Sequence, residues 1–374
     1  MLGRCNPESA NGIDKSVFYL SSAQAALGHD VALFSVSPKP VIPVPGVETH
    51  TYPPLMNVNI PSPSLWRSLR HWCPDVVHIH SLYVPANALL ALALRRKGIP
   101  YVITPHGAAD EHVMLRRAYL KWPYRLLIER PTLNRAAFVH AIADQRSIID
   151  YGVTSPVVVA PNAIDAATVP GDLDKQTCRT KAAINSPTRL ALFIGRLDRL
   201  HKGLDILINA FADIAPDMQE LVLVLVGPDH GNSRRILLDL TARRGIESRV
   251  IFRDAAFGVA KFELLAAADF VVQPSRWEAG VPFSVLEALA VGRPCLVSHA
   301  ADPQAMIARY DAGVVVEPTI AAVARGLEQL GRASNETLRR QGDRAIVLAR
   351  EEFSWPSVAR TLIDGYARHA AVPA

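Results

Sequence analysis

The sequence lacks any apolar run long enough to cross a membrane. Its longest apolar stretches, ALLALAL (88–94) and LVLVLV (221–226), are far shorter than the ~20 residues that a spanning helix needs. The first residues, MLGRCNPESANG, contain no apolar segment of the signal-peptide kind. We therefore expect a cytoplasmic protein, or one that lies peripherally on the inner face of a membrane.

Cysteine is scarce, and the pattern of a metal site is missing. The four cysteines are far apart and form no CxxC pair, which favours free thiols in a reducing compartment. His78 and His80 alternate along one predicted strand and share a face, but no third metal ligand is evident nearby. We expect no metal site and interpret His80 as a residue that lines the ligand cleft.

A strong charge bias is also missing. The 374 residues carry a net charge of only +5, less than is usual in a protein that tracks nucleic acid, although a local basic patch is compatible with it. We expect no nucleic-acid partner. Hydrophobic residues make up 49% and charged residues 20%, which fits an ordered globular protein, and the length favours two domains.

Short β-branched runs alternate with helical patterns in two successive series. The predicted strands are 31–36, 75–80, 101–104, 137–142 and 157–160, then 189–195, 220–227, 249–254, 268–273 and 294–298. Two such series predict an α/β fold of two doubly wound, Rossmann-like domains with parallel sheets. Ligands of such folds bind at the carboxyl ends of the strands, so the expected site is a central cleft that the two domains face.

The predicted domain boundaries follow the change from one series to the other. An N-terminal domain covers 1–165, a polar and poorly periodic linker covers 166–188, and a second domain covers 189–350. The remaining stretch, 351–374, contains an amphipathic helix that we expect to pack back on the N-terminal domain.

A basic turn follows the first strand of the second series. Gly195 and Arg196 end that strand, and Lys202 lies six residues beyond the arginine, just before a predicted helix. A glycine permits close backbone approach, and both cations can reach one diphosphate. The spacing is neither GxGxxG nor GxxxxGK[ST], which excludes the dinucleotide and P-loop patterns. The alternative is a basic loop on a solvated surface.

An acidic turn follows strand 268–273. Glu278 lies in the loop and Glu287 in the helix predicted over 282–291, whose first N–H groups, near Phe283 and Ser284, favour a phosphate. Two surface carboxylates are the alternative. Cations hold phosphates and carboxylates accept hydrogen bonds from sugar hydroxyls, so the two turns together indicate a nucleotide-sugar site.

Seven segments, in order along the chain, resemble the retaining, GT-B-fold glycosyltransferases of family 4, also called group 1. They are NPESANGIDKS (6–16), PDVVHIH (74–80), TPHG (104–107), PNAID (161–165), GRLDRLHKGLD (195–205), LVGPD (225–229) and SRWE…FSVLEAL (275–289). The resemblance covers nearly the whole chain. It implies transfer of a sugar from a nucleoside-diphosphate sugar to a hydroxyl acceptor with retention of configuration, without a further cofactor.

The resemblance also implies roles for the donor-side residues. Arg196 and Lys202, with Gly195 at the strand end, would contact the donor diphosphate. Glu287 would hold the ribose hydroxyls, and Glu278 would contact hydroxyls of the transferred sugar. Backbone N–H groups of Phe283 and Ser284 would reach phosphate or sugar.

In the first half of the chain, the resemblance implies that Gly12 approaches the donor phosphates and that His106 lies beside the reacting sugar. A structural role is the alternative for His106. The chain departs from the family pattern in four places. Glu278 and Glu287 are nine positions apart where eight is usual, Asn11 and Ala163 replace common glycines, and only MLGRC precedes the first motif, so the first strand is expected to be short or missing.

The activity and the acceptor remain open on the sequence alone. A metal-independent glycosyltransferase of polysaccharide or glycolipid synthesis is favoured. The alternatives are a sugar-nucleotide epimerase or hydrolase, and a non-catalytic protein that binds the nucleotide sugar. Residues 112–130 combine basic residues with aromatics and leucines, which suits an anionic membrane surface and a lipid-linked acceptor. An ordinary amphipathic helix that covers the sheet is the other interpretation.

Overall fold

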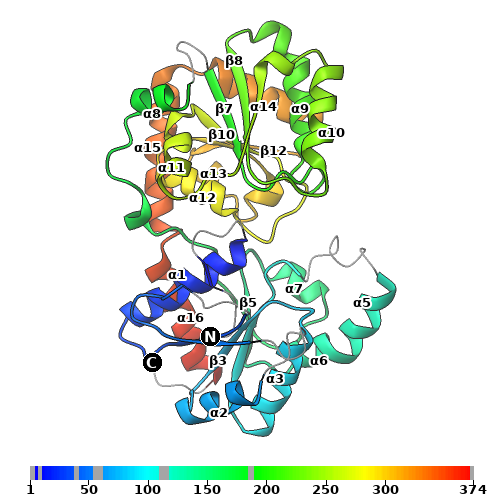
Figure 1. The fold of residues 1–374 in the computed structure, drawn as a ribbon, viewed down its shortest axis with the longest axis vertical. Helices are drawn as coiled ribbons and strands as arrows, with labels where there is room; N and C mark the ends of the chain where they lie inside the picture. Colours follow the sequence, from blue (N-terminus) through cyan, green and yellow to red (C-terminus); the bar gives the residue numbers. More distant parts are fainter. Residues whose placement is uncertain are drawn as a thin grey trace. The chain divides into compact units, whose positions relative to one another are not determined.

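The computed structural model forms two compact α/β units (Figure 1). Unit 1 holds residues 1–162 and 355–374, and unit 2 holds residues 163–354. All strand pairs are parallel, so the predicted α/β class with parallel sheets is confirmed. The structure describes residues 5–6, 11–37, 42–53, 62–108, 118–183 and 189–370.

Unit 2 is built on one six-stranded sheet of order β12-β11-β10-β7-β8-β9. The chain starts in the middle at β7, adds β8 and β9 on one side, and then returns to add β10, β11 and β12 on the other. The change of direction between β7 and β10 is the switch point at which such sheets bind ligands. The strands are β7 (Arg189–Ile194), β8 (Leu221–Val226), β9 (Val250–Arg253), β10 (Phe270–Gln273), β11 (Cys295–Ser298) and β12 (Gly313–Val316).

Helices cover both faces of this sheet (Figure 1). They are α8 (Lys175–Lys181), α9 (Leu204–Ile214), α10 (Ser233–Arg243), α11 (Gly258–Ala267), α12 (Phe283–Ala290), α13 (Met306–Arg309), α14 (Ile320–Arg332) and α15 (Asn335–Glu351). Four short 3-10 turns are Ala166–Thr168, Ala215–Asp217, Glu247–Arg249 and His299–Ala301. Two hydrophobic clusters, one on each face, enclose the sheet, which explains why strands such as LVLVLV are almost continuously apolar.

The stretch that we expected to be a linker, 166–188, is partly folded into unit 2. Helix α8 packs against α11, and its Cys178 is buried. The neighbouring Arg179 is also buried, and its guanidinium donates a 2.5 Å hydrogen bond to the carboxylate of Asp269. The expectation of an irregular linker was therefore wrong for α8: a single buried cysteine and a buried arginine give no hydrophobic periodicity to recognise.

Unit 1 contains two smaller sheets, β1-β2 and β3-β4-β5-β6. Helices α1 and α16 pack against each other, and α16 also contacts β5 and β6. The strands are β1 (Ala32–Val36), β2 (Glu48–Tyr52), β3 (Val77–His80), β4 (Tyr101–Thr104), β5 (Phe138–Ala141) and β6 (Val157–Val159). The helices are α1 (Gly12–Ala26), α2 (Pro63–Trp72), α3 (Pro85–Arg96), α5 (Ala118–Tyr124), the π-helical η1 (Arg125–Glu129), α6 (Arg130–Leu133), α7 (Arg146–Asp150) and α16 (Trp355–Ala370).

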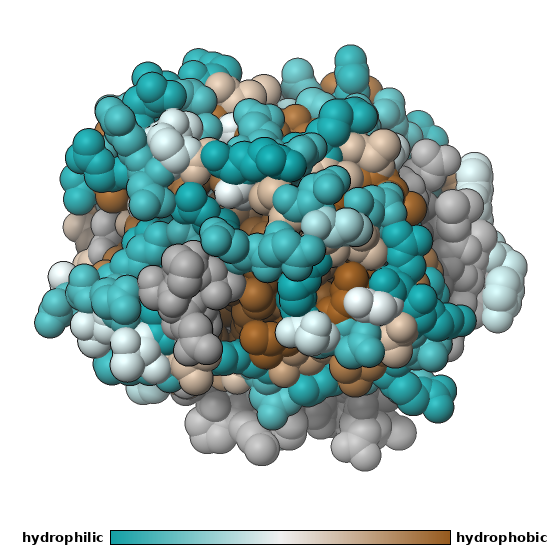
Figure 2. Space-filling view, turned by 90° about the horizontal axis from the view of Figure 1, so that it is seen from above, coloured by the Kyte–Doolittle hydropathy of each residue, from teal (hydrophilic) through white to brown (hydrophobic). Residues whose placement is uncertain are grey.

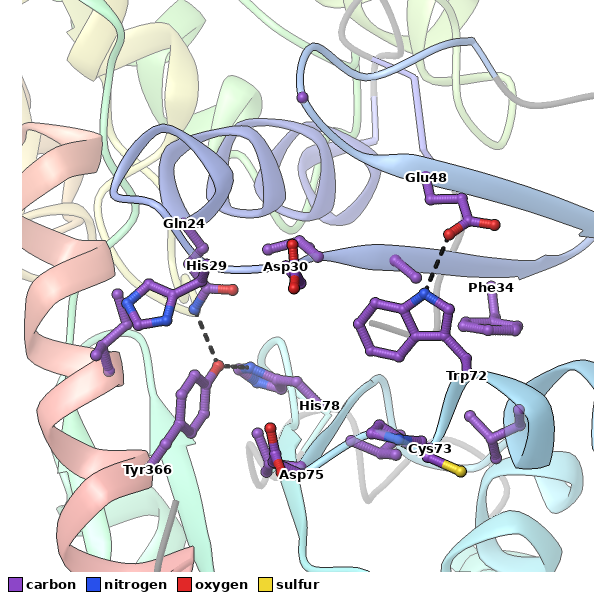
Figure 3. A pocket seen from close by; sticks show the side chains of 18 of the residues that line it. Gln24, His29, Asp30, Phe34, Glu48, Trp72, Cys73, Asp75, His78 and Tyr366 are labelled. Carbon is purple, nitrogen blue, oxygen red and sulfur yellow. Dashed lines mark hydrogen bonds between the residues drawn. The ribbon is translucent and has the colours of Figure 1, made fainter. Parts of the chain in front are cut away.

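A pocket of about 690 Å³ separates the two sheets of unit 1 (Figure 3). Its walls include Ala32 of β1, Val77 of β3 and Tyr366 of α16, and it reaches Asp30 and Asp75, which precede the two strands. It therefore lies toward the amino ends of β1 and β3, whereas parallel sheets bind ligands at the carboxyl ends. The expectation about the first strand stays a prediction, since residues 1–4 and 7–10 lie outside the described part.

One face of the molecule is mostly polar. In the face that Figure 2 shows, hydrophilic residues dominate and hydrophobic ones are visible mainly in a recess. Within the described ranges, no helix combines the length and the apolar character that crossing a membrane requires. All four cysteines are free thiols, as predicted.

Candidate active site

Two loops meet at the switch point of unit 2, one after β7 and one after β10. Gly203, which has φ 63°, precedes α9, and a Cβ added there would lie 2.2 Å from the carbonyl oxygen of Pro274, the residue that follows β10. Gly227 likewise lies so close to Gly195 that a Cβ would come within 1.7 Å of its carbonyl oxygen. Glycine at these positions lets the loops approach closely, and the side chains that follow share one site.

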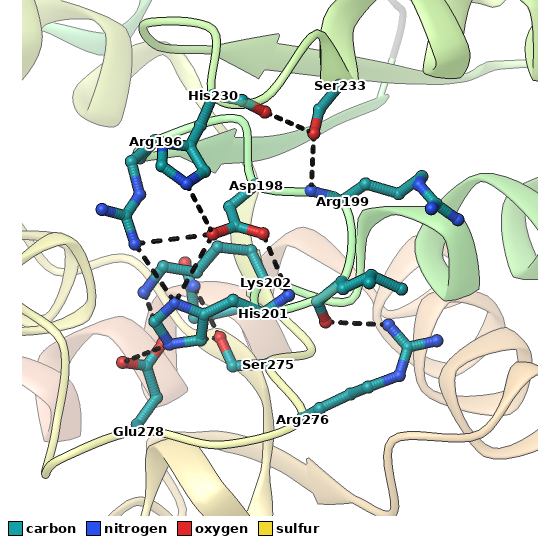
Figure 4. A network of polar contacts seen from close by, with 12 residues as sticks. Arg196, Asp198, Arg199, His201, Lys202, His230, Ser233, Ser275, Arg276 and Glu278 are labelled. Atoms are coloured by element: carbon teal, nitrogen blue, oxygen red, sulfur yellow. Dashed lines mark hydrogen bonds and ion pairs between the residues drawn. The ribbon is translucent and has the colours of Figure 1, made fainter. Parts of the chain in front are cut away.

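Lys202 and Glu278, each predicted from its own loop, form an ion pair at this point (Figure 4). The Lys202 Nζ to Glu278 Oε1 distance is 2.5 Å, and both side chains are largely buried. Ser275 donates a 2.6 Å hydrogen bond to the same carboxylate oxygen, and Gln273 donates to the Ser275 hydroxyl at 2.9 Å. Glu278 is thus fixed by a cation from one loop and a hydroxyl from its own.

The pKa of Glu278 reports the balance of these contacts. Burial alone would raise the pKa of this carboxyl, but the charge of Lys202 and further donors outweigh burial and hold the pKa at about 2. Glu278 is therefore a carboxylate at physiological pH, able to accept hydrogen bonds but unsuited to donate a proton.

Arg196 belongs to a second set of contacts in the loop after β7. Its Nη2 lies 3.5 Å from Asp198 Oδ2 and 3.3 Å from His201 Nδ1, and its side chain is partly exposed. The other ring nitrogen of His201 lies 3.6 Å from Glu278 Oε2, which exceeds hydrogen-bond length, and its ring stacks on Trp277 at 5.0 Å. His201 therefore lies between the arginine and the Lys202–Glu278 pair.

Arg276 clamps the two loops together. Its guanidinium binds both carboxylate oxygens of Asp205 at 2.8 Å and donates to the carbonyl of Leu200 at 2.8 Å. Its backbone N–H donates to the carbonyl of His201 at 3.0 Å. A bidentate Arg–carboxylate pair has a fixed geometry, so Arg276 holds the loop of Glu278 in register with the loop of Lys202.

Helix α12 begins beside this site. Pro282 is its N-cap and the helix starts at Phe283, one residue later than predicted. Phe283 and Ser284 thus occupy the first turn, where N–H groups have no acceptor within the helix and attract anions. The Ser284 hydroxyl lies 3.5 Å from Gln273 Oε1, at the limit of a hydrogen bond, which links α12 to the end of β10.

Glu287 has a different cation from the one that serves Glu278. It is 4% exposed on α12, and its Oε1 accepts a 2.6 Å hydrogen bond from Nζ of Lys261 on α11. The two predicted glutamates therefore belong to two separate ion pairs. A buried, paired carboxylate can still accept hydrogen bonds from two hydroxyls through its remaining lone pairs.

The other two predicted residues, Gly12 and His106, lie in unit 1. Gly12 is the first residue of α1, and Asn11 caps that helix by accepting a 3.2 Å hydrogen bond from the N–H of Ile13. His106 follows β4 with φ 52°, an unusual value for a residue with a side chain. Its Nε2 lies 2.8 Å from Nδ1 of His80, at the end of the neighbouring β3.

Several charged or polar residues of the site were missed by the sequence reasoning: Asp198, Asp205, Lys261, Ser275 and Arg276. Their signal was available in principle, because all but Lys261 lie within four residues of a predicted site residue or inside a quoted motif. No local pattern marks Lys261, which meets Glu287 only through the packing of α11 on α12. Among the described residues, no group of three or more His, Cys, Asp or Glu side chains is arranged to hold a metal ion.

Comparison with known proteins shows the family of the chain. Residues 10–168 match the family described as Glycosyltransferase Family 4, and residues 188–332 match Glycosyl transferases group 1. The chain belongs to the family 4, group 1 glycosyltransferases. The second match spans both loops of the switch point, so the Lys202–Glu278 pair lies within the part of this glycosyltransferase that defines its group.

The relatives extend over nearly the whole glycosyltransferase. A D-inositol 3-phosphate glycosyltransferase of Frankia alni is 28% identical over 98% of this chain and 96% of its own length. Sucrose-phosphate synthase of Thermosynechococcus elongatus has a TM-score of 0.78 at 21% identity, covering 97% and 95% of the two chains. Anabaena Alr3699/HepE in complex with UDP-glucose has a TM-score of 0.74 at 17% identity, covering 98% of each. These structures establish the GT-B fold.

Proposed function

We propose that this glycosyltransferase moves a sugar from a nucleoside-diphosphate sugar to a hydroxyl acceptor with retention of anomeric configuration. The Lys202–Glu278 pair at the switch point of unit 2 carries the proposal. It places a cation and a carboxylate that is ionised at physiological pH 2.5 Å apart, next to the first turn of α12. This combination fits the junction between a diphosphate and a sugar. The names of relatives, with UDP-glucose in one and an inositol phosphate acceptor in another, support the same class of donor and acceptor.

The chemistry follows from the charges. Lys202, Arg196 and the first N–H groups of α12 would stabilise the leaving diphosphate, and Glu278 would accept hydrogen bonds from the sugar. Each such electrostatic contact typically contributes ~2.7–4 kcal/mol to the transition state. The acceptor would attack from the face that the diphosphate leaves, and the departing phosphate would take the acceptor proton. Anomeric analysis of the product by NMR tests retention, and an inverted product would contradict it.

We propose that transfer needs no metal, because protein cations and helix N–H groups can neutralise the diphosphate. The test is activity in EDTA, with and without added Mn²⁺. Unchanged turnover supports the proposal. Loss of activity that Mn²⁺ restores contradicts it.

The donor site is tested first by thermal shift with UDP, GDP, ADP and CMP. A ligand at 100 times its dissociation constant stabilises the folded state by ~2.7 kcal/mol. We expect one diphosphate to raise the Tm of the wild type and Lys202→Ala to lose that shift. Lys181→Ala is the matched control, since Lys181 also pairs with a glutamate at 2.5 Å but lies on the surface. A shift that survives in Lys202→Ala would remove Lys202 from the donor site.

Two alternatives differ in their products. A sugar-nucleotide hydrolase or epimerase would act on the donor without an acceptor, whereas a transferase releases nucleoside diphosphate in proportion to added acceptor. A protein that only binds the nucleotide sugar would give a thermal shift and no turnover. Measuring nucleoside diphosphate release with and without acceptor separates all three.

A contact with a membrane, and with it a lipid-linked acceptor in cell-surface polysaccharide or glycolipid synthesis, is a second proposal. Tyr119, Trp122 and Leu127 of α5 and η1 are 76%, 53% and 77% exposed, which forms an apolar projection. Arg125 and Arg130 keep their charge, but their guanidinium groups are held against the protein because they donate to the carbonyls of Tyr151 and Gly152. Residues 112–117 lie outside the described part.

The exposed apolar side chains carry the argument for a membrane contact, and the arginines beside them favour an anionic surface. Co-sedimentation with vesicles of anionic phospholipid tests it. We expect the wild type to bind and Leu127→Ser to bind less. Leu238→Ser, at an exposed leucine of α10, is the control and should bind as the wild type does. Equal binding by Leu127→Ser would contradict the proposal.

A further inference from the structure

A series of buried hydrogen bonds, here called the histidine chain, connects helices α1 and α16 of unit 1 to strands β3, β4 and β5. Tyr366 OH lies 3.1 Å from Gln24 Nε2 and 2.7 Å from His78 Nδ1. His78 Nε2 lies 2.6 Å from the Thr104 hydroxyl, which lies 2.8 Å from His140 Nδ1. The chain ends where His140 Nε2 meets the carbonyl of Ala160 at 2.8 Å. Its side chains are buried, and burial lowers the pKa of both histidines, His140 to about 4, so they are neutral.

The carbonyl of Ala160, at one end of this series of hydrogen bonds, determines the direction of every bond in the series. A carbonyl only accepts, so His140 carries its proton on Nε2 and accepts at Nδ1 from the Thr104 hydroxyl. Thr104 then accepts from Nε2–H of His78, and His78 Nδ1 accepts from the Tyr366 hydroxyl. Gln24 donates to Tyr366. Each neutral histidine of the chain is thus assigned one tautomer by its partners.

The same reasoning applies to His80 and His106, which stand outside this chain. His80 is 4% exposed, its ring stacks on that of His78 at 4.5 Å, and its Nδ1 contacts His106 Nε2 at 2.8 Å. Its Nε2 is buried and has no hydrogen-bond partner among the described residues. Burial lowers the pKa of both side chains, that of His106 to about 3, so one neutral ring donates to the other.

Two arrangements satisfy the contact between the rings. If His106 Nε2–H donated, His80 would carry its own proton on Nε2 and leave a buried N–H without an acceptor. If His80 Nδ1–H donates, its buried Nε2 has only an unused lone pair. A buried donor without a partner is the costlier defect and is rarer in folded proteins than an unused acceptor. The second arrangement is therefore favoured.

We propose that His80 is a positioning residue that holds His106 as the Nδ1–H tautomer, so that His106 offers a ligand an N–H donor and no basic nitrogen. The inference rests on the proposed function only in taking His106 as a ligand contact. His106 is partly exposed and follows β4 at its carboxyl end, where parallel sheets bind ligands. An N–H donor fits a sugar hydroxyl or a phosphate oxygen.

This assignment restricts the chemistry of unit 1. Both nitrogens of His106 are committed, Nε2 to the His80 proton and Nδ1 to its own. His106 therefore cannot remove the acceptor proton while the contact with His80 is intact. The proton must go to another group, which agrees with a departing phosphate that takes it.

The tautomer can be measured without any substrate. Two-bond ¹H–¹⁵N spectra of imidazole-labelled protein distinguish Nδ1–H from Nε2–H rings. We expect Nδ1–H for His106 in the wild type and in His80→Asn, whose side-chain amide can donate from nearly the same position as Nδ1. His80→Leu removes the donor, and we expect His106 to lose its single tautomer. An Nε2–H signal for wild-type His106 would overturn the proposal, as would an unchanged Nδ1–H signal in His80→Leu.

A kinetic readout separates this proposal from the proposed function. Once a donor is identified, we expect His80→Leu to lower kcat/KM about tenfold, the size of one well-placed hydrogen bond. His80→Asn should restore most of this loss, which repair of packing alone would not do, since asparagine is no better a filler than leucine. Equal activity of the two variants would overturn the positioning role. Absence of any nucleotide shift would overturn the proposed function and leave the tautomer result standing.

Discussion

Units 1 and 2 share one architecture but treat polar groups at the ends of their strands in opposite ways. Unit 2 has a continuous six-stranded sheet, and its switch point carries the ion pairs of Lys202 with Glu278 and Arg276 with Asp205. Unit 1 has an interrupted sheet, and the ends of its strands carry neutral rings and hydroxyls, among them His80 and Thr104. Unit 2 thus offers paired charges at this edge of its sheet, and unit 1 offers hydrogen bonds of fixed direction.

The comparison shows that ion pairs organise the strand ends of unit 2, whereas neutral hydrogen bonds organise those of unit 1. Under the proposed function, the paired charges of unit 2 would exchange partners when a diphosphate enters. A neutral chain whose every donor is assigned has no alternative partners and keeps its arrangement. We therefore expect substitutions in unit 2 to act through unpaired charge and substitutions in unit 1 to act through unpaired hydrogen-bonding groups.

The largest effect on stability is expected at Asp269 of unit 2. Its buried carboxylate binds Lys175, Arg179 and the N–H of Leu190 at 2.5–2.7 Å. Arg189 also lies 3.3 Å from this carboxylate, so Asp269→Asn leaves three cations without their counter-charge and should lower the free energy of unfolding by about 3–5 kcal/mol. Urea unfolding measures it.

The control for Asp269 is Asp239→Asn, which breaks an exposed pair with Arg243 on α10 and should cost less than about 0.5 kcal/mol. Similar losses of unfolding free energy in the two variants would mean that the buried carboxylate of Asp269 stabilises the fold no more than an exposed one does.

The next effect is a pH dependence in unit 2. The pKa of Glu278 falls from 4.5 to about 2 on folding, so its contribution is complete above pH 4.5 and is lost as pH falls through 2. The shift corresponds to about 3 kcal/mol. The difference in unfolding free energy between the wild type and Glu278→Gln should therefore shrink between pH 5 and pH 2. A constant difference would show that the carboxylate is not specially stabilised.

A smaller effect is expected in the neutral chain of unit 1. Thr104→Val leaves His78 Nε2–H and His140 Nδ1 without a partner and should cost about 2 kcal/mol. Thr104→Ser keeps the hydroxyl and is the matched control, with a smaller loss. Chemical denaturation of both variants decides the point, and equal losses would indicate packing rather than hydrogen bonding.

The smallest effect has the opposite sign to that of Glu278. Burial raises the pKa of Glu129 in unit 1 to about 7, despite the N–H that Tyr83 donates to it, so the folded state binds a proton that the unfolded state releases above pH 4.5. Stability should fall as pH rises from 4.5 to 7. Glu129→Gln should remove this fall and raise the free energy of unfolding by roughly 1 kcal/mol at pH 8. The gain is small because burying the amide also costs free energy, which offsets part of what is saved by removing the ionised carboxyl. Calorimetry at pH 5 and pH 8 tests it, and an identical gain at both would contradict the assignment.

Much of the fold was predictable because parallel strands buried on both faces leave a strong signal. All ten predicted runs correspond to strands, for example 101–104 and 294–298, within one or two residues at most ends. Two strands were missed. β2, ETHTY, is polar and only partly buried, and β12, GVVV, is too short to stand out beside a glycine. Neither carries the continuous apolar run by which the others were recognised.

The sequence predicted which residues of the candidate site lie in each loop, but not which of them are in contact. Spacing placed Lys202 and Glu278 at strand ends, but their contact depends on β10 pairing with β7, which joins residues 76 positions apart. The ion pair of Lys261 with Glu287 and the contact of His80 with His106 depend likewise on how elements pack. A sequence identifies which groups are available, and the strand order decides which of them meet.

The route of the chain through unit 1 has a consequence for its synthesis. Helix α16, with Tyr366, belongs to unit 1 but is synthesised after all of unit 2. Domains generally fold as they emerge, so unit 2 can be complete while unit 1 still waits for its final helix. The nascent protein should therefore complete unit 2 first, and the Tyr366 hydroxyl that joins the hydrogen-bonded histidines of unit 1 becomes available only afterwards.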